Sequence, residues 1–445
     1  MGSSFSDFVL KTRFEDIPDA TIDRVQDLVL DLIGVSAAAV DLEASVIVRE
    51  AACRMYGAGE GAASARILFD GRKVSRAGAA WAGANQIDSL DAHDGYSLAK
   101  GHAGCGLLPG VLAFCESQNV SGREFLAAMV IGYEIASRAG LALHGTVSDY
   151  HTSGAWVSLA VAALGVRLSG GNAEALRQAI GIAEYHGPRS QMMREIDNPT
   201  MLHDGSGWGS MVGVVAAELA LSGFAGAPAV TVEAKESADY WRDLGDVWLT
   251  EQQNIKLYPI CRWAHAPIKA ALDLRDAHGL TADNIAAVEV HSFHEATRLA
   301  RGVPETTGKA QYSINYPIAT ALHFGRIGAK EVSPETFSDP VLGGLIDKIS
   351  VHECDHCNAN FPADRLGRTV VITNSGERLD SGITRAPGEH TNPVDRAGII
   401  EKFDAFVAPI ISEDRTKAIK SAVFALHDAH IATSNMTDLL YSPVK

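Results

Sequence analysis

The sequence predicts a mainly α protein in which a large all-helical domain carries a smaller α+β lid domain. Helix-type periodicity, or nearly continuous Ala/Gly-rich apolar sequence, dominates up to about residue 270. Strand-type alternation is confined to about residues 285–385. Helix-type sequence then returns after a Gly/Pro-rich link. We therefore expect a helical domain at 1–268 and an α+β lid at 269–395, with 396–445 returning to the helical domain.

The helices of the first domain are indicated by start signals and by apolar faces. Pro18 and Asp19 suit a helix start, and the apolar residues after them share one face: Ile22, Val25, Val29, Leu32 and Ile33. Ser121 and Glu124 have the spacing of a capping box, and that helix is expected to end near Gly140. Two further segments, 154–171 and 207–226, are apolar all round and rich in small residues. We expect those two helices to be buried and closely packed.

The α+β unit is expected from three alternating segments, 286–292, 348–352 and 368–382. Ser375-Gly376 supplies hairpin chemistry within the third segment. Helical stretches are expected between the strands, at 314–325 and 340–349, and the Gly/Pro-rich link follows at 385–398. A small unit inserted into a helical body creates a domain interface, where ligand sites are common.

Composition excludes several function classes. The 445 residues carry a formal charge of −16, which argues against nucleic acid or an anionic membrane surface as a partner. The N-terminus is polar, and no uninterrupted apolar run approaches the roughly 18 residues of a membrane span. The six cysteines are scattered rather than arrayed as a disulfide framework. We expect a cytoplasmic protein.

One loop concentrates ionisable residues beside a core segment. The stretch "LDAHDGYSLAKGHAGCGLLPG", residues 90–110, has neither helix nor strand period and leads directly into apolar sequence. Its ionisable residues are Asp91, His93, Asp94, Lys100 and His102. Charges at the entrance to a core are costly unless they have partners or a function. This loop is therefore the first candidate for a site.

Four further polar clusters repeat the arrangement of polar residues beside a buried segment. They are Tyr150 with His151; His203 with Asp204; Lys256, Cys261, Arg262 and His265; and Tyr312 with Tyr316. The first two clusters directly precede apolar helices, whose N-termini favour anions. Any single histidine here would more often be structural. The repetition favours a shared pocket for a small anionic ligand.

The remaining motifs are weak. "HECDHC" places Cys354 and Cys357 at C-x-x-C spacing beside His352 and His356, but the second half of a zinc site is missing. We therefore predict no metal, and a non-catalytic protein with a metal-stabilised lid is the rival from another class. "GSGWGSM" lacks the lysine of a P-loop, and a G-x-S-x-G nucleophile elbow is absent.

Taken together, the quoted stretches resemble the MmgE/PrpD family. The resemblance rests on the order and spacing of "LDAHDG", "GYEIASRAG", "YHTSGAWVSLAVAALGVRLSG", "MLHDGSGWGSMVGVVAAELALSG", "IKLYPICRWAHAPIKA", "KAQYSINYPIATAL" and "RAPGEHTNPV". The family includes 2-methylcitrate dehydratase, cis-aconitate decarboxylase and iminodisuccinate epimerase. It implies a large helical domain, an α+β lid, an active site between them, homodimers and no cofactor.

The resemblance also implies particular site residues. The family's loop aspartate and histidine fall on Asp91 and His102, the histidine before the apolar helix on His151, the lid-side lysine on Lys256, and the tyrosine of "S-x-x-Y" on Tyr316. Three positions depart from the family pattern. His93-Asp94 replaces two acids, Thr200 replaces a lysine, and Cys261 replaces a histidine. These departures make iminodisuccinate epimerase the member that this chain resembles most.

We therefore expect a cofactor-independent epimerase that inverts the carbon α to a carboxylate in an iminodisuccinate-like substrate by two-base proton transfer. The candidate catalytic residues are Lys100, His102, His151, Asp91 and Tyr150; the candidate substrate-binding residues are Lys256, Tyr316, His203, Arg189 and Arg194. A Cys105/Cys261 base pair stays open as a lesser alternative. The alternative function is a dehydratase or decarboxylase of a methylcitrate-like or aconitate-like tricarboxylic acid.

Overall fold

The computed structural model describes residues 3–444, and its mainly α class confirms the prediction. The helices of the first part are α1 (Ser3–Lys11), α2 (Asp19–Ala38), α3 (Glu43–Met55), α4 (Arg76–Leu90), α5 (Gly104–Gln118), α6 (Gly122–Thr146), α7 (Gly154–Leu168), α8 (Ala173–His186), α9 (Met192–Asp197), α10 (Ser206–Leu221) and α11 (Val230–Glu233). The sequence predicted an all-helical domain, but this part also contains two strands. Strands β1 (Ser64–Arg66) and β2 (Lys73–Ser75) pair antiparallel, and three-residue strands are too short to show an alternating pattern.

The expected close packing of the small-residue helices is confirmed. Helix α7 packs against α5, α6, α8 and α10. Gly213 of α10 lies against Val161 of α7, where an added Cβ would approach Val161 Cβ to 2.5 Å. Glycine therefore permits the short distance between these two helices. The N-cap of α6 is also confirmed, since the Ser121 side chain accepts a hydrogen bond from the Glu124 backbone N–H at 3.2 Å.

Helix α6 continues to Thr146, beyond the predicted end near Gly140. Gly140 marks a close approach rather than a helix end, because a Cβ there would lie 3.0 Å from Ala99 and 3.2 Å from the Trp156 ring. By length and composition α6 could cross a membrane, but 94% of its most apolar window is buried within the protein. Such burial is typical of the central helix of a folded domain.

A five-stranded sheet forms the core of the second part. Its strands are β3 (Ile285–Ser292), β4 (Ile349–Glu353), β5 (Leu366–Thr373), β6 (Arg378–Asp380) and β7 (Thr384–Arg385). The order is β4-β3-β5-β6, with β7 also on β5; β3 and β4 are parallel and the other pairs antiparallel. The predicted hairpin between β5 and β6 is confirmed, with Gly376 at φ 87°. The short strand β7 begins two residues after the third predicted segment, and the alternating pattern does not predict it.

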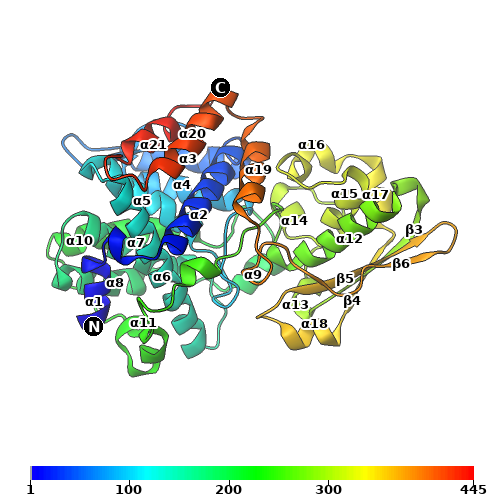
Figure 1. Ribbon diagram of the computed structural model, residues 1–445, viewed down its shortest axis with the longest axis horizontal. Helices are drawn as coiled ribbons and strands as arrows, with labels where there is room; N and C mark the ends of the chain where they lie inside the picture. Colours follow the sequence, from blue (N-terminus) through cyan, green and yellow to red (C-terminus); the bar gives the residue numbers. More distant parts are fainter. Residues whose placement is uncertain (1–2, 445) are drawn as a thin grey trace.

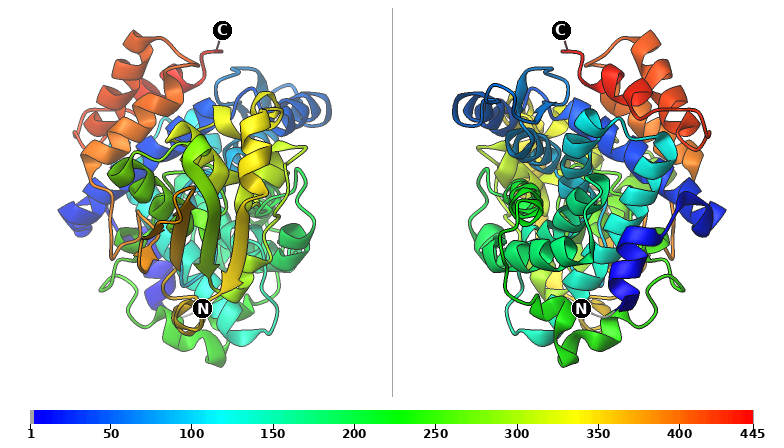
Figure 2. Two further views of the ribbon diagram at one scale, coloured as in Figure 1. Left: turned by 90° about the vertical axis from the view of Figure 1, so that its right-hand side faces the viewer. Right: turned by 90° about the vertical axis from the view of Figure 1, so that its left-hand side faces the viewer.

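Helices surround this sheet and connect it to the first part. They are α12 (His265–His278), α13 (His294–Thr297), α14 (Thr307–Gln311), α15 (Asn315–Phe324), α16 (Pro334–Phe337), α17 (Pro340–Ile346) and α18 (Asp355–Asn360). Helix α12 packs on β5 and on α15. Figure 1 shows the sheet at one end of the molecule and α7, α8 and α10 at the other, and the left view of Figure 2 looks onto the strands.

The C-terminal helices, α19 (Arg396–Val407), α20 (Glu413–Ala425) and α21 (Ser434–Leu440), lie beside the N-terminal part of the chain (Figure 1). Helix α19 packs along α2. A buried ion pair joins the two helices, because Lys402 Nζ lies 2.6 Å from Asp31 Oδ1. The same ammonium donates a hydrogen bond to the Ala92 carbonyl at 2.7 Å, which lies in the loop after α4. Lys402 therefore fixes α19, α2 and this loop to one another.

We expect Lys402→Met to lower the free energy of unfolding by about 3–5 kcal/mol, because it leaves the Asp31 carboxylate buried without its ion-pair partner. Urea denaturation followed by circular dichroism measures this change. Lys417→Met removes an exposed ion pair with Glu413 and should leave the denaturation midpoint unchanged. Equal effects of the two substitutions would contradict the role given to Lys402.

Candidate active site

The loop between α4 and α5, residues 91–103, is buried rather than solvated. Asp91, His93 and Asp94 are each at most 2% exposed. Asp91 ends α4 in the left-handed conformation, with φ 53°, and Lys100 also has a positive φ, 56°. Such conformations are unfavourable for residues other than glycine and are found mostly where surrounding contacts enforce them. The polar residues of this loop thus follow a path that the fold imposes.

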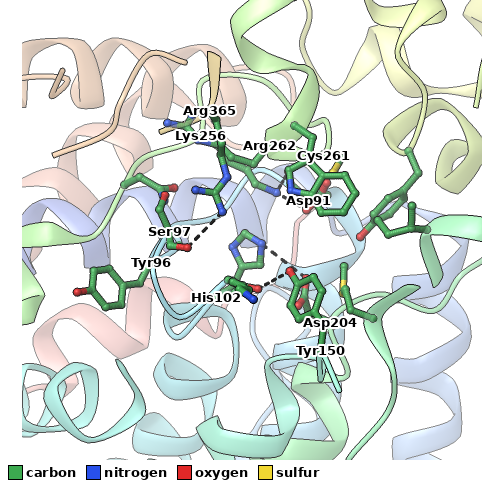
Figure 3. Close-up of a pocket in the computed structure, with 18 residues that line it drawn as sticks. Asp91, Tyr96, Ser97, His102, Tyr150, Asp204, Lys256, Cys261, Arg262 and Arg365 are labelled. Carbon is green, nitrogen blue, oxygen red and sulfur yellow. Dashed lines mark hydrogen bonds and ion pairs between the residues drawn. The ribbon is translucent and has the colours of Figure 1, made fainter. Parts of the chain in front are cut away.

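This loop forms one wall of a cavity. Segments from both parts of the chain complete the lining: Asp91, Gly95, Tyr96, Ser97, Lys100, Gly101, His102, Tyr150, Met192, Ile196, Asp204, Asn254, Lys256, Cys261, Arg262, Trp263, Tyr312 and Arg365. Figure 3 shows the His102 ring near the centre, with Lys256 and Arg262 on one side and Asp204 and Tyr150 on the other. Side chains that are distant in sequence therefore meet in one cavity.

Lys256 and Asp91 form an ion pair at the base of the cavity. Their side chains are only 1% and 3% exposed, and Lys256 Nζ also donates a hydrogen bond to the Asp91 carbonyl at 3.2 Å. Lys256 is positioned by the backbone of the two residues before it: Asn254 pairs with Gly95, and the Ile255 N–H donates to the Gly388 carbonyl. Burial raises the pKa of Asp91 to about 6, even though the Lys256 ammonium favours its charged form.

His102 has the geometry of a neutral acid–base group. Its Nδ1 lies against the Asp94 carbonyl, which can only accept, so Nδ1 carries the hydrogen and Nε2 has a free lone pair. Nε2 lies 3.6 Å from Asp204 Oδ2. Burial lowers the pKa of His102 well below its usual value, and the Lys256 charge lowers it further. The imidazole is therefore neutral near pH 7, and Asp204 can stabilise the cation formed when Nε2 takes a proton.

Asp204 and Ser153 fix the orientation of His102. The Ser153 hydroxyl donates to Asp204 Oδ1 at 2.7 Å and accepts from the His102 backbone N–H at 2.8 Å. Ser153 precedes α7, and Asp204 lies two residues before α10. The first turns of these two helices thus hold the carboxylate that faces the imidazole, which explains why polar clusters precede these apolar helices in the sequence.

The two arginines of the cavity differ in their partners. Glu389 binds Arg262, with Oε1 3.1 Å from Nε and 3.0 Å from one terminal nitrogen. Burial opposes the charge on Glu389, but the attraction of Arg262 and Arg365 prevails and lowers its pKa. Arg365, 5% exposed, donates to the Pro362 and Ser97 carbonyls at 2.9 and 3.3 Å, while its Nε has no partner. Among residues 3–444, no carboxylate lies within ion-pair distance of Arg365.

Lys100 and Tyr150 lie together at the cavity wall. The Tyr150 hydroxyl donates to the Lys100 carbonyl at 2.6 Å, and Lys100 Nζ lies 5.5 Å from the centre of the Tyr150 ring. Burial raises the pKa of Tyr150 well above its usual value, so the phenol stays protonated. In the described part of the chain, Lys100 makes no ion pair. Arg365 and Lys100 therefore bring positive charge to the cavity, and no carboxylate of the described chain forms an ion pair with either of them.

The candidate residues from the sequence fall into two groups. Asp91, Lys100, His102, Tyr150 and Lys256 line the cavity. The other candidates lie outside its lining: His151, Tyr316, His203, Arg189 and Arg194. The buried Tyr316 hydroxyl donates to the Glu331 carbonyl, so it points away from the cavity, and Tyr312 lines the wall instead.

The histidine and arginine candidates outside the lining occupy different environments. His151 is buried, and its Nδ1 has no hydrogen-bond partner among the described residues. His203 lies 3.4 Å from the Tyr312 hydroxyl and lines a separate surface groove. Arg189 and Arg194 are exposed, and Arg194 lines the same groove together with Thr200. The cavity therefore draws its arginines from elsewhere in the chain.

Sequence reasoning missed Arg365, a charged residue of the cavity lining. It stands alone in "FPADRLG" and carries no motif, and only the position of β5 brings it to the cavity. The Cys105/Cys261 alternative loses support, because burial raises the pKa of both thiols and Cys105 does not line the cavity. "HECDHC" does not gather three metal-ligating side chains; within residues 3–444 only Asp88, His93 and Cys105 do so.

Two stretches of the chain match known protein domains. Residues 3–241 match the MmgE/PrpD N-terminal domain, and residues 258–428 match the MmgE/PrpD C-terminal domain. The chain is 23% identical to the cis-aconitate decarboxylase of Aspergillus terreus, over 97% of this chain and 94% of that protein. It is also 23% identical to the cis-aconitate decarboxylase-like protein oryM of Aspergillus oryzae, over 94% of this chain and 93% of that protein.

We expect catalytic efficiency, kcat/KM, to fall as the pH drops below about 6, because protonation of Asp91 removes the counter-charge of Lys256. Asp91→Asn should abolish this acid limb and lower the plateau. Asp94 also has a pKa of about 6 but lies outside the lining, so Asp94→Asn should keep the limb. A limb that persists in Asp91→Asn and vanishes in Asp94→Asn would contradict the assignment.

Protonation of Asp91 is expected to lower activity, but its effect on the free energy of unfolding has the opposite sign. Its pKa in the folded protein is raised above the value of an exposed aspartate, so the folded state binds more protons than the unfolded state between about pH 4 and 6. The contribution of Asp91 to stability therefore falls as the pH rises through this window. Its protonation at low pH does not by itself unfold the protein.

Proposed function

The chain belongs to the MmgE/PrpD family, and from this premise we propose that it is an enzyme that transfers a proton at the carbon next to a carboxylate of a small polycarboxylic acid. One observation carries the proposal: the neutral imidazole of His102 shares a buried cavity with cationic side chains, and these cations outnumber the acidic side chains that form ion pairs with them. Asp91 pairs with Lys256 and Glu389 with Arg262, whereas Arg365 and Lys100 lack such partners in the described chain.

This combination suits chemistry at a carbon beside a carboxylate. Negative charge that develops on this carbon adds to the charge of an already anionic substrate, so the site must supply fixed cations and hydrogen-bond donors. Arg365 and Lys100 can bind substrate carboxylates, and His102 Nε2 can take or return the proton. Asp204 stabilises the protonated imidazole, and the cavity walls restrict water. The reaction requires no electron transfer.

The site favours a lyase, namely a decarboxylase or dehydratase of an aconitate-like or methylcitrate-like tricarboxylic acid. Among the described residues, His102 is the single imidazole that lines the cavity, and one acid–base group suffices when one proton is exchanged. In decarboxylation, the bond to one carboxylate breaks and carbon dioxide leaves, and the carbon then takes a proton from His102 Nε2, which must first have accepted that proton from water or from a protonated substrate carboxyl group. The names of the Aspergillus relatives support this choice.

Epimerisation of an iminodisuccinate-like substrate is the second candidate. Inversion needs a second proton carrier on the opposite face of the carbon, and Lys100 lines the same cavity without an ion-pair partner among residues 3–444. Its ammonium group is the feature that supports this reaction. The two candidates differ in their products, since a lyase forms or rearranges an alkene whereas an epimerase changes only configuration.

We expect purified protein to convert a tricarboxylate in a panel of cis-aconitate, 2-methylcitrate and iminodisuccinate in deuterated water, read by NMR. His102→Gln should reduce kcat about 10²- to 10⁴-fold, because it removes the acid–base group. His278→Gln, an exposed substitution at the end of α12, is the matched control. Inversion of iminodisuccinate that is lost in Lys100→Met would identify the epimerase instead. Unchanged turnover in His102→Gln would refute the proposed acid–base role.

We expect Arg365→Gln to raise KM about 10- to 100-fold with a smaller change in kcat, because it removes a charge-assisted hydrogen bond to a substrate carboxylate. Arg365→Lys should recover part of the affinity. Arg385→Gln is the control, since Arg385 is an exposed arginine of β7 that pairs with Asp364. Steady-state kinetics with the substrate selected by the panel makes the comparison. An unchanged KM in Arg365→Gln would exclude a carboxylate contact.

A further inference from the structure

A second polar cluster lies behind the loop that carries His102. It consists of Asp88 at the end of α4, His93 in the loop and Cys105 at the start of α5, each at most 4% exposed. One ligand atom from each residue lies within 4.8 Å of the other two. None of the three residues lines the cavity, and the mechanism above uses none of them.

The hydrogen positions leave two acceptors facing each other. His93 Nδ1 lies 3.3 Å from the Asp94 carbonyl, so Nδ1 carries the hydrogen and Nε2 has a free lone pair. Nε2 lies 3.2 Å from Asp88 Oδ1, yet neither atom has a hydrogen-bond partner in the described part of the chain. Two buried acceptors at this distance repel each other unless a proton or a cation lies between them.

This arrangement matches a metal site in two respects. Histidine ligands commonly donate the other ring N–H to a carbonyl, as His93 does to Asp94. An oxygen and a nitrogen bound to one tetrahedral Zn²⁺ lie about 3.3 Å apart, close to the separation of Asp88 Oδ1 and His93 Nε2. Cys105 Sγ supplies the third ligand and lies 3.0 Å from Ser206 Oγ, which can donate to the thiolate after metal binding.

We propose that Asp88, His93 and Cys105 bind one divalent transition-metal ion of Zn²⁺ type, which joins the two ends of the active-site loop. A carboxylate, an imidazole and a thiolate form the mixed oxygen, nitrogen and sulfur set that such ions prefer to Ca²⁺ or Mg²⁺. The ion supplies the positive charge that the Asp88 carboxylate lacks. It also leaves a fourth position, which a water molecule can occupy.

The position of the cluster gives this ion a structural role. Asp88 and Cys105 flank residues 91–103, and the His93 ring meets the His102 ring edge to face with centroids 4.6 Å apart. A metal bound here would restrain the segment that positions Asp91 and His102. The proposal does not depend on the proposed reaction, because metal binding can be measured without any substrate.

The test uses the full chain expressed in zinc-supplemented medium, and a second sample that is stripped with a chelator and reloaded with Co²⁺. Mass spectrometry for metals should give one Zn²⁺ per chain. The Co²⁺ protein should show a thiolate-to-cobalt charge-transfer band in the near ultraviolet. Metal should raise the midpoint of thermal unfolding by several degrees, since it binds the folded state. Less than a tenth of an equivalent of bound metal would overturn the proposal.

Substitutions locate the ion. Cys105→Ser should abolish the charge-transfer band, and His93→Gln should weaken Co²⁺ binding at least tenfold; the second variant decides if the first does not fold. Two control variants should retain the band. Cys115→Ser removes another buried cysteine of the same helix, and Cys354→Ser removes a cysteine of "HECDHC". A band that survives both Cys105→Ser and His93→Gln, or that is lost in Cys354→Ser, would place the metal elsewhere and refute this site.

Discussion

The buried ion pair between Lys256 and Asp91 is the constraint on which the rest of the site depends. Moving each charge out of water costs several kcal/mol, and only close pairing with further hydrogen bonds offsets this cost. Lys256 meets the requirement by binding both the carboxylate and the backbone carbonyl of Asp91. Because Lys256 belongs to the segment leading to α12, the pair connects the loop after α4 with the start of the sheet-containing part.

A second lysine holds the neighbouring residue of the same loop. Lys402 of α19 pairs with Asp31 of α2 and donates to the Ala92 carbonyl. Asp94 is held in turn, since the Tyr133 hydroxyl donates to its carboxylate at 2.6 Å and its other oxygen caps the Gly104 N–H. The loop is therefore fixed by groups from α2, α6, α19 and the segment before α12. This dense set of contacts explains how Asp91 and Lys100 keep positive φ angles.

The distribution of charge in the cavity differs from that of the whole protein. The chain carries a net charge of −16, yet around the cavity cations outnumber the acids that pair with them. Contact distance explains the difference, because screened surface carboxylates contribute little inside a buried cavity, whereas a guanidinium a few ångströms from a bound anion contributes strongly. A net negative charge is thus compatible with a cavity whose cations favour an anion.

The sequence by itself determined the helical body, the position of the alternating strands and the loop in which charge gathers beside a core. These features depend on local order: the period of apolar residues shows helix or strand, and Ser375-Gly376 shows the hairpin. Motif order also selected Asp91, His102 and Lys256 as candidate site residues, and all three line the cavity. Local order failed where a glycine serves a contact rather than a helix end, as at Gly140, which lies inside α6 where a side chain would crowd Trp156 and Ala99.

Only the tertiary structure decided which polar side chains share a cavity. Tyr312 rather than Tyr316 faces it, Arg365 enters it from the start of β5, and His151 does not line it. The meeting of Asp88, His93 and Cys105 is likewise a result of how α4 and α5 pack. The physical reason is that direction, burial and the pairing of charges depend on residues hundreds of positions apart, whereas periodicity and turn chemistry act within a few residues.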